Sequence, residues 1–163
     1  MKKLLTLASV LFFLSTSAQT KDDINLIQAM YGKDKRDLME AYMTFPDTAK
    51  ANKFWKIYDK YEAERKTLGQ QWVAIIQDYG KNYSSLNDAK ADGLVMRMSA
   101  NNVAFENLYK KYYALLKPAV GALKASQFLQ LENYLRGVVK TNIMSQIPFV
   151  GEIDRTKLPA PKQ

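Results

Sequence analysis

The side chains that most often act as nucleophiles, general bases or zinc ligands are missing, because the 163 residues include no cysteine and no histidine. Without cysteine the chain has no disulfide, no thiolate nucleophile and no lipid-modified N-terminal cysteine. Without histidine it has no Ser-His-Asp triad and no H-E-x-x-H zinc motif. These two absences exclude most enzyme classes.

Two carboxylates on one helical face, Asp59 and Glu62, are the nearest approach to an acid–base pair. Three lysines surround them, Lys56, Lys60 and Lys66, and this spacing favours exposed ion pairs along the helix. The sequence contains no D-x-[DN]-x-[DN]-G loop, no G-x-x-x-x-G-K and no G-x-S-x-G motif. A ferritin-like diiron site would need histidine. We therefore expect no enzyme activity, no metal and no cofactor.

The elements that must position any binding residues are helices. Few helix breakers interrupt the chain and no stretch alternates β-branched and polar residues, so the sequence predicts an all-α fold. Four helices are expected, over residues 22–43, 48–83, 88–117 and 125–147. Pro118 should break or kink the third of them.

An apolar seam with a seven-residue repeat marks the two long helices. In the second helix the seam positions are Phe54, Tyr58, Tyr61, Arg65, Leu68, Trp72, Ile75 and Tyr79. In the third helix they are Leu94, Met98, Asn101, Phe105, Leu108, Tyr112, Leu115 and Ala119. This period predicts a left-handed, coiled-coil-like antiparallel hairpin about 45 Å long, with a shorter helix at each end.

Folding the chain about Ser84 and Ser85 fixes which seam residues face one another. Tyr61 is expected opposite Leu108, and Phe54 opposite Leu115. Arg65 is the one charged seam residue, and a polar residue in such a seam tends to fix register at a cost in stability.

The first 18 residues have the features of a cleaved export signal. Lys2 and Lys3 give a basic start, residues 4–14 are mostly apolar, and small residues lead up to Ala18. The apolar run is too short to span a membrane, which takes about 20 residues. We therefore expect a signal peptide over 1–18, a soluble periplasmic protein, and no transmembrane segment after cleavage.

The mature chain is expected to form one helical domain over 19–147. Pro148 should stop the last helix, and the tail at 148–163 holds three of the five prolines in the chain. This composition predicts an extended or disordered tail. The alternative is a strap that packs Phe149, Val150 or Ile153 onto the helices.

Positive charge is concentrated in the C-terminal third. Residues 19–106 carry 13 basic and 13 acidic side chains, whereas residues 107–163 carry nine and three. The basic part of a candidate binding surface consists of Lys110, Lys111, Lys117, Lys124, Arg136 and Lys140. Such a surface attracts acidic partners; export argues against nucleic acid. The alternative is a solvated basic face that aids solubility alone.

Three apolar residues outside the seams, Trp55, Met96 and Val103, complete the candidate binding surface. Trp55 and Val73 lie about 100° from the second-helix seam, and Met96 and Val103 lie on the back of the third helix with Lys110. They are either a second packing surface, for the terminal helices or a dimer partner, or an exposed patch used for binding. The pattern leaves both alternatives open.

The last helix begins with Leu123-Lys124-Ala125-Ser126-Gln127-Phe128-Leu129, and Leu123 and Gln127 fit an L-T-x-x-Q motif in which Lys124 replaces Thr. With the export signal, the absence of cysteine and the long hairpin, residues 45–140 resemble the Spy/CpxP-like periplasmic family with LTxxQ motifs. A second copy of the motif, expected within residues 45–50, lacks both its Leu and its Gln.

The resemblance implies a curved helical homodimer that holds unfolded or stressed envelope proteins without ATP. Some relatives instead sense stress by binding the periplasmic part of a membrane signalling protein. Residues 54–62 also look like exported helical proteins of Bacteroidetes-type bacteria, some of which are labelled as sensors linked to extracytoplasmic sigma factors. A chaperone-like protein is therefore expected, with a regulatory partner of one membrane signalling protein as the alternative.

Overall fold

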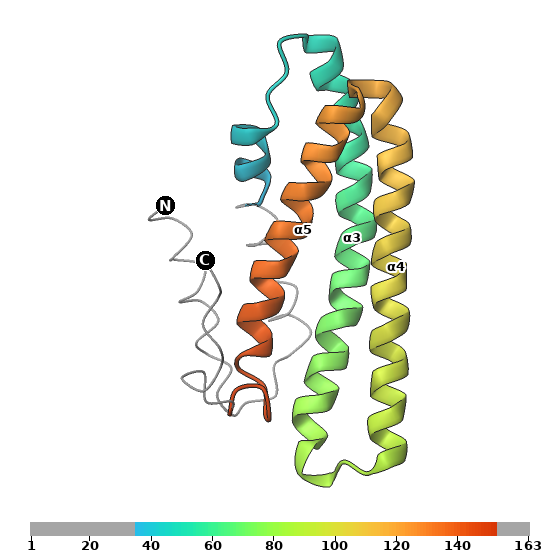
Figure 1. Cartoon of the computed structure of the whole chain (residues 1–163), viewed down its shortest axis with the longest axis vertical. Helices are drawn as coiled ribbons and strands as arrows, with labels where there is room; N and C mark the ends of the chain where they lie inside the picture. Colours follow the sequence, from blue (N-terminus) through green and yellow to red (C-terminus); the bar gives the residue numbers. More distant parts are fainter. Residues whose placement is uncertain (1–34, 153–163) are drawn as a thin grey trace, which may run out of the picture.

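A computed structural model describes residues 35–152, and every regular element in that range is a helix (Figure 1). The all-α prediction, with its long antiparallel hairpin, is confirmed for this part of the chain. The predicted signal peptide at 1–18, residues 22–34 of the first predicted helix and residues 153–163 of the tail lie outside the described residues.

Helices α3 (Thr48–Asn82) and α4 (Asp88–Val120) form the hairpin, joined by the short 3-10 helix η2 (Tyr83–Ser85). Each long helix begins at a side-chain cap. The Asp47 carboxylate accepts a hydrogen bond from the Ala49 amide at 2.8 Å, and the Asn87 side chain accepts one from the Lys90 amide at 3.0 Å. Caps of this kind satisfy amides that have no partner in the first turn, so these local signals set where the hairpin arms begin.

Of the two predicted effects of Pro118, the break at residue 117 is wrong, since α4 continues through this proline to Val120. Proline lacks the amide that would donate to the carbonyl of Ala114, and α4 continues for only two residues beyond it. Helix α4 ends instead before Gly121, whose φ of 91° lies in the region that favours glycine and whose amide donates to the Lys117 carbonyl at 3.0 Å. Helix α5 (Ala122–Met144) begins directly after this glycine, three residues earlier than predicted.

The chain after α5 folds into turns, so the described start of the tail is not extended as predicted. The Val150 amide donates to the Pro148 carbonyl at 2.9 Å, and the Gly151 amide donates to the Ile147 carbonyl at 2.8 Å. The Tyr79 hydroxyl on α3 also reaches the Pro148 carbonyl, at 3.5 Å. These bonds hold residues 147–152 in a compact arrangement near the C-terminal end of α3.

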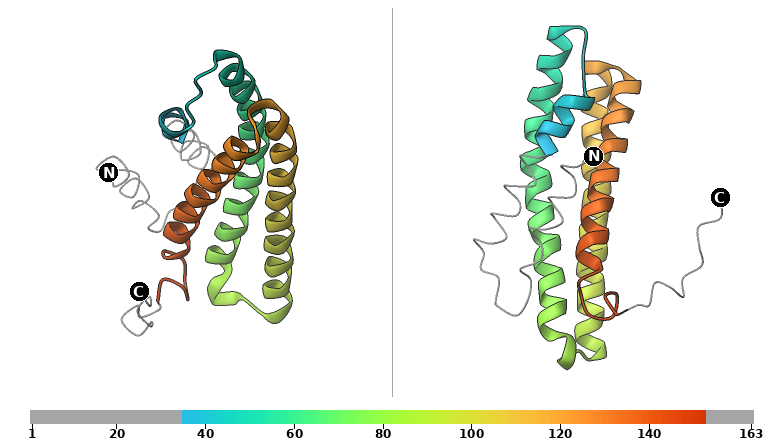
Figure 2. Two further views of the ribbon diagram at one scale, coloured as in Figure 1. Left: turned by 45° about the horizontal axis from the view of Figure 1, so that its top comes forward. Right: turned by 90° about the vertical axis from the view of Figure 1, so that its left-hand side faces the viewer.

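Two further helical pieces pack on the hairpin. Helix α5 runs back along it, and the short helix at residues 35–42 lies beside α3 and α5 (Figures 1 and 2). Residues 43–47 connect this short helix to α3 without helical structure. The arrangement places residues far apart in sequence side by side at one end of the hairpin.

The core contains a dense group of aromatic rings at the end of the hairpin where α5 begins. We call this group the aromatic end; it consists of Phe54, Tyr58, Tyr61, Tyr112 and Phe128. The Tyr61 ring lies 5.1 Å from Phe128 and 5.2 Å from Tyr112, measured between centroids, in edge-to-face geometry. Such pairs contribute beyond their buried area.

The seam prediction is correct for most positions of α3 and wrong at Leu115 of α4. Leu115 is 46% exposed and therefore does not face Phe54, which is fully buried. Leu116 is buried in its place, and Phe54 packs against Phe128 of α5 at 5.7 Å. The buried face of α4 is therefore shifted by one residue from the predicted seam. A straight helix drifts from a strict seven-residue repeat, and α5 packs here as a third helix.

Within residues 35–152, no helix combines the length and the apolar character needed to cross a membrane.

Candidate functional site

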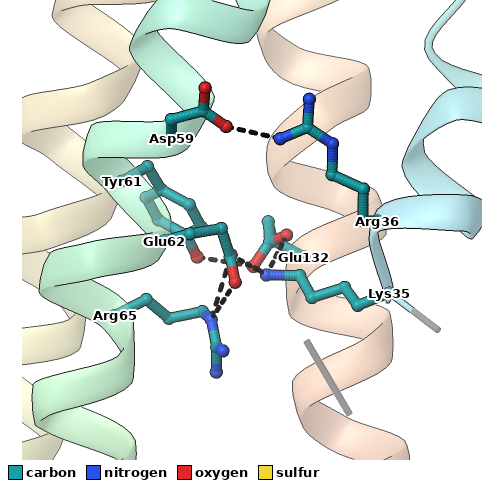
Figure 3. Close-up of polar contacts among 7 residues, drawn as sticks. All are labelled: Lys35, Arg36, Asp59, Tyr61, Glu62, Arg65 and Glu132. Atoms are coloured by element: carbon teal, nitrogen blue, oxygen red, sulfur yellow. Dashed lines mark hydrogen bonds and ion pairs between the residues drawn. The ribbon is translucent and has the colours of Figure 1, made fainter. Parts of the chain in front are cut away.

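Five side chains from three elements form an ion network beside the aromatic end (Figure 3). Lys35 comes from the short helix at 35–42, Glu132 comes from α5, and the remaining members come from α3. The members are Lys35, Tyr61, Glu62, Arg65 and Glu132. We refer to this set as the ion network.

Lys35 occupies the centre of the ion network, and its side chain is completely buried. Its ammonium lies 2.6 and 2.7 Å from the two carboxylate oxygens of Glu132 and also donates to Glu62. The rings of Tyr58 and Tyr61 lie 5.7 and 5.1 Å from the nitrogen, within the range of cation–π attraction. Burial lowers the pKa of Lys35, and the carboxylate of Glu132 opposes that shift.

Glu132 lies on the buried face of α5, in a stripe with Ala125, Phe128 and Leu135. The Tyr61 hydroxyl donates to its Oε2 at 2.5 Å. Burial raises the pKa of Glu132, while Lys35 acts in the opposite direction. Burial also raises the pKa of Tyr61, so this phenol remains a hydrogen-bond donor. A buried carboxylate needs such partners, since an unpaired one is costly.

Glu62 links the buried lysine to the edge of the network. Arg65 donates from Nε to both Glu62 oxygens, at 3.0 and 3.1 Å. Arg36, next to Lys35, pairs with Asp59. The prediction that lysines along α3 would pair with Asp59 and Glu62 is therefore wrong, because these carboxylates bind the helix at 35–42 and, for Glu62, Arg65.

The apolar members of the candidate binding surface divide into two kinds. Trp55 is half-buried, with Tyr58 at 5.3 Å between ring centroids and the Arg36 guanidinium 4.6 Å from its ring. It therefore belongs to the packing surface for the short helix. Met96 and Val103 are instead 63% and 56% exposed on α4, and so is Val95, which was not among the predicted members, at 64%. The packing alternative therefore applies to Trp55, whereas Met96 and Val103 are exposed and their use in binding stays a prediction.

The basic members of the candidate binding surface also differ in their contacts. Lys111 pairs with Glu64 at 2.6 Å, and hydrogen bonds from Lys111 and Tyr112 lower the pKa of Glu64. Lys124 lies 5.7 Å from the Phe45 ring, and Arg136 lies 3.9 Å from the Phe105 ring. These three side chains contribute to contacts between elements.

The other three basic members are exposed: Lys110, Lys117 and Lys140. Lys110 and Lys117 follow Met96 and Val103 along α4 at intervals of seven residues. Residues seven apart lie on one face of a helix. We call Met96, Val103, Lys110 and Lys117 the outer row. These four are spaced along one face of α4 without a contact between them that the structure records, and Trp55 and Arg136 make other contacts.

Sequence reasoning missed Lys35 and Glu132, the two most deeply buried charges of the described residues. A signal for Glu132 was present, because it interrupts the apolar stripe of the last helix as Arg65 interrupts the seam of α3. Lys35 carried no such signal, because its helix was predicted from apolar positions alone.

Within residues 35–152, no group of three or more acidic residues is placed to hold a metal ion. The two carboxylates nearest one another in the site, Glu62 and Glu132, are bridged by the Lys35 ammonium. Comparisons of the chain with family models, curated proteins and solved structures found no match.

Proposed function

We propose that this protein is an exported, ATP-independent chaperone-like protein that binds unfolded segments of envelope proteins through the outer row of α4. The observation that carries the proposal is the exposure of Val95, Met96 and Val103 on one helix, next to Lys110 and Lys117. Exposed apolar side chains that cluster on a surface are typical of binding sites.

The outer row combines two forces that suit a binder of many clients. Apolar contact retains a segment that has lost its fold, whereas positive charge attracts acidic segments and speeds the encounter. Methionine adapts to clients of different shape because it is unbranched and polarisable. Attraction by Lys110 and Lys117 should weaken with salt over a Debye length of about 10 Å at 0.1 M, while apolar retention persists.

The test is suppression of aggregation of several unrelated denatured clients by the mature protein, without nucleotide. The double substitution Met96→Ser/Val103→Ser should reduce suppression severalfold. A matched control exists on α5, where Leu123 and Tyr134 are also exposed, so Leu123→Ser/Tyr134→Ser should retain activity. Equal loss in both variants would remove the outer row from the proposal.

Charge reversal separates attraction from retention. Lys110→Glu/Lys117→Glu should slow capture of acidic clients most, and this difference from the unsubstituted protein should shrink at high salt. If near-stoichiometric protein leaves the aggregation of every client unchanged, the chaperone proposal is wrong. Capture of one membrane signalling protein from envelope extract would then replace it with the regulatory alternative.

A further inference from the structure

We propose that the groove between α3 and α5 is a binding site for a lysine-bearing amphipathic helix, and that residues 35–43 are its exchangeable ligand. The groove receives this segment from the same molecule in the structure and would accept the same segment from a second copy. We call residues 35–43 the docked segment. The proposal concerns a different surface from the outer row and does not depend on the chaperone proposal.

The docked segment enters the groove through one face. Lys35, Met39 and Met43 follow one another at intervals of four residues, and all three are buried. Asp37 and Ala41, on the opposite face, are exposed. This is the geometry by which an amphipathic helix binds a groove on another protein, with anchors one turn apart.

The chemistry of the groove selects an ammonium at the first anchor. Glu132 is buried, and among the described residues its polar partners are Lys35 and the Tyr61 hydroxyl. A neutral anchor would leave this carboxylate without its cation in a desolvated site, which is costly. The Tyr58 and Tyr61 rings add the aromatic faces that bind cations.

A second contact recognises the neighbouring basic residue. The Arg36 guanidinium stacks over Trp55 and pairs with Asp59 at the rim of the groove. Arginine suits this position because its plane stacks on an indole while its nitrogens bind a carboxylate. The groove therefore recognises Lys-Arg followed by methionines one and two turns after the lysine.

The docked segment is joined to the hairpin in a way that permits exchange. Residues 43–47 are not helical and include Pro46, and within the described residues the backbone hydrogen bonds of the docked segment are internal to it. Its attachment is therefore through side chains. A buried ion pair contributes more to specificity than to net stability, since desolvation offsets the attraction. Departure of the segment removes Met39 and Met43 from the core cluster and exposes the part that they cover, while the contacts among α3, α4 and α5 do not pass through the segment.

One experiment supplies the docked segment from outside. The full-length variant Lys35→Glu/Met39→Glu places two carboxylates against the acidic, apolar groove and should evict its own segment. A fluorescent synthetic peptide of residues 35–47 should bind this variant at least tenfold more tightly than it binds the control Ala41→Glu/Tyr42→Glu, whose two new carboxylates are exposed. A peptide with Lys35→Gln should bind at least tenfold more weakly than the natural peptide. Equal binding in either comparison would overturn the proposal.

A second measurement keeps the docked segment's own anchor lysine and does not require the evicted variant to fold. Because the chain has no cysteine, a single introduced thiol reports exposure of one position. Met39→Cys in the docked segment and Ala125→Cys in α5 both replace fully buried side chains. The Met39→Cys thiol should react at least tenfold faster with a water-soluble reagent. Equal rates would show that the segment leaves only when the whole protein unfolds, and the proposal would fail.

Discussion

The two ends of the hairpin are held together by different forces. At the aromatic end, rings from α3, α4 and α5 lie 5 to 6 Å apart and enclose a buried ion network. Toward the hairpin tip, beyond the aromatic end, the buried apolar residues of α3 are Trp72, Ile75 and Ile76, and polar contacts also join α3 and α4: near mid-hairpin Asn101 donates to the Leu68 carbonyl at 3.0 Å, and nearer the tip Arg97 pairs with Asp78. The same apolar repeat runs through both ends.

The difference follows from the number of elements that meet at each end. Three helices and the docked segment supply rings and charges around Tyr61, so water is excluded on several sides. Toward the tip, the hairpin is joined by the turns at 147–152, which contact α3, and not by the docked segment, so more of each helix surface faces water, where ion pairs contribute little to stability. Stability is therefore expected to be concentrated at the aromatic end, which the following substitutions test.

Phe128→Ala should have the largest effect. The Phe128 ring is fully buried and contacts Phe54, Tyr58 and Tyr61. Truncation removes its buried area and leaves a cavity, which costs about 3–5 kcal/mol. Chemical unfolding followed by far-ultraviolet circular dichroism measures the free energy of unfolding. A loss below 1 kcal/mol would show that the aromatic end is not the main source of stability.

Lys35→Met should come next, with a loss of about 3 kcal/mol, because removing one partner of a buried ion pair leaves the other charge uncompensated. Adding Glu132→Leu should recover most of that loss, since an apolar pair of similar size fills the same site. The same unfolding measurement on both single variants and the double variant gives the coupling free energy between Lys35 and Glu132. Additive losses would mean that the two side chains do not stabilise one another.

The pH dependence of stability should show a smaller effect of the same network. Burial raises the pKa of Glu132 above its ordinary value of 4.5. As pH falls from neutrality toward that value, the folded protein binds a proton before the unfolded chain does, so this group's contribution to stability grows. It is lost as pH rises through the folded pKa.

Glu132→Gln removes this titration. The free energy of unfolding of the unsubstituted protein should therefore rise relative to that of Glu132→Gln as pH falls from 7 to about 4.5. Glu64 has a lowered pKa and acts in the opposite direction, but it is present in both proteins and cancels in the difference. A difference that stays constant with pH would show that Glu132 titrates normally.

The hairpin tip should respond least. Arg97→Ala removes an ion pair whose side chains are both about half exposed, and such pairs contribute about 0–1 kcal/mol. Asn101→Ala removes one hydrogen bond to the Leu68 carbonyl and should cost about 1 kcal/mol. Losses at the tip that match those of Phe128→Ala would contradict the proposed difference between the two ends.

The hairpin could be predicted because its signals are local. The spacing of apolar residues, the Asn87 cap and the turn after Tyr83 all operate within a few residues of one another. Arg65 was also correctly placed on the buried seam. Its partner Glu62, one turn earlier on the same helix, was assigned to lysines because exposed pairs are the commoner outcome.

The ion network could not be predicted, because it joins segments whose alignment depends on the whole fold. Glu132 is recognisable as a charge in an apolar stripe, but nothing in the sequence pairs it with Lys35 rather than with Arg65. The shift from Leu115 to Leu116 has a similar origin, since α5 decides which face of α4 is buried. Rules for the packing of two helices do not include the effect of a third helix on which face is buried.

Lys35 and Glu132 are separated by 97 positions, and this separation determines when the N-terminal part can finish folding. Closing a loop of that length is slow compared with joining neighbouring helices. During synthesis Lys35 leaves the ribosome well before the residues that complete its site exist. The site of Lys35 is therefore complete only when α5 has packed on the hairpin, and we expect residues 35–43 to reach their final position after that step.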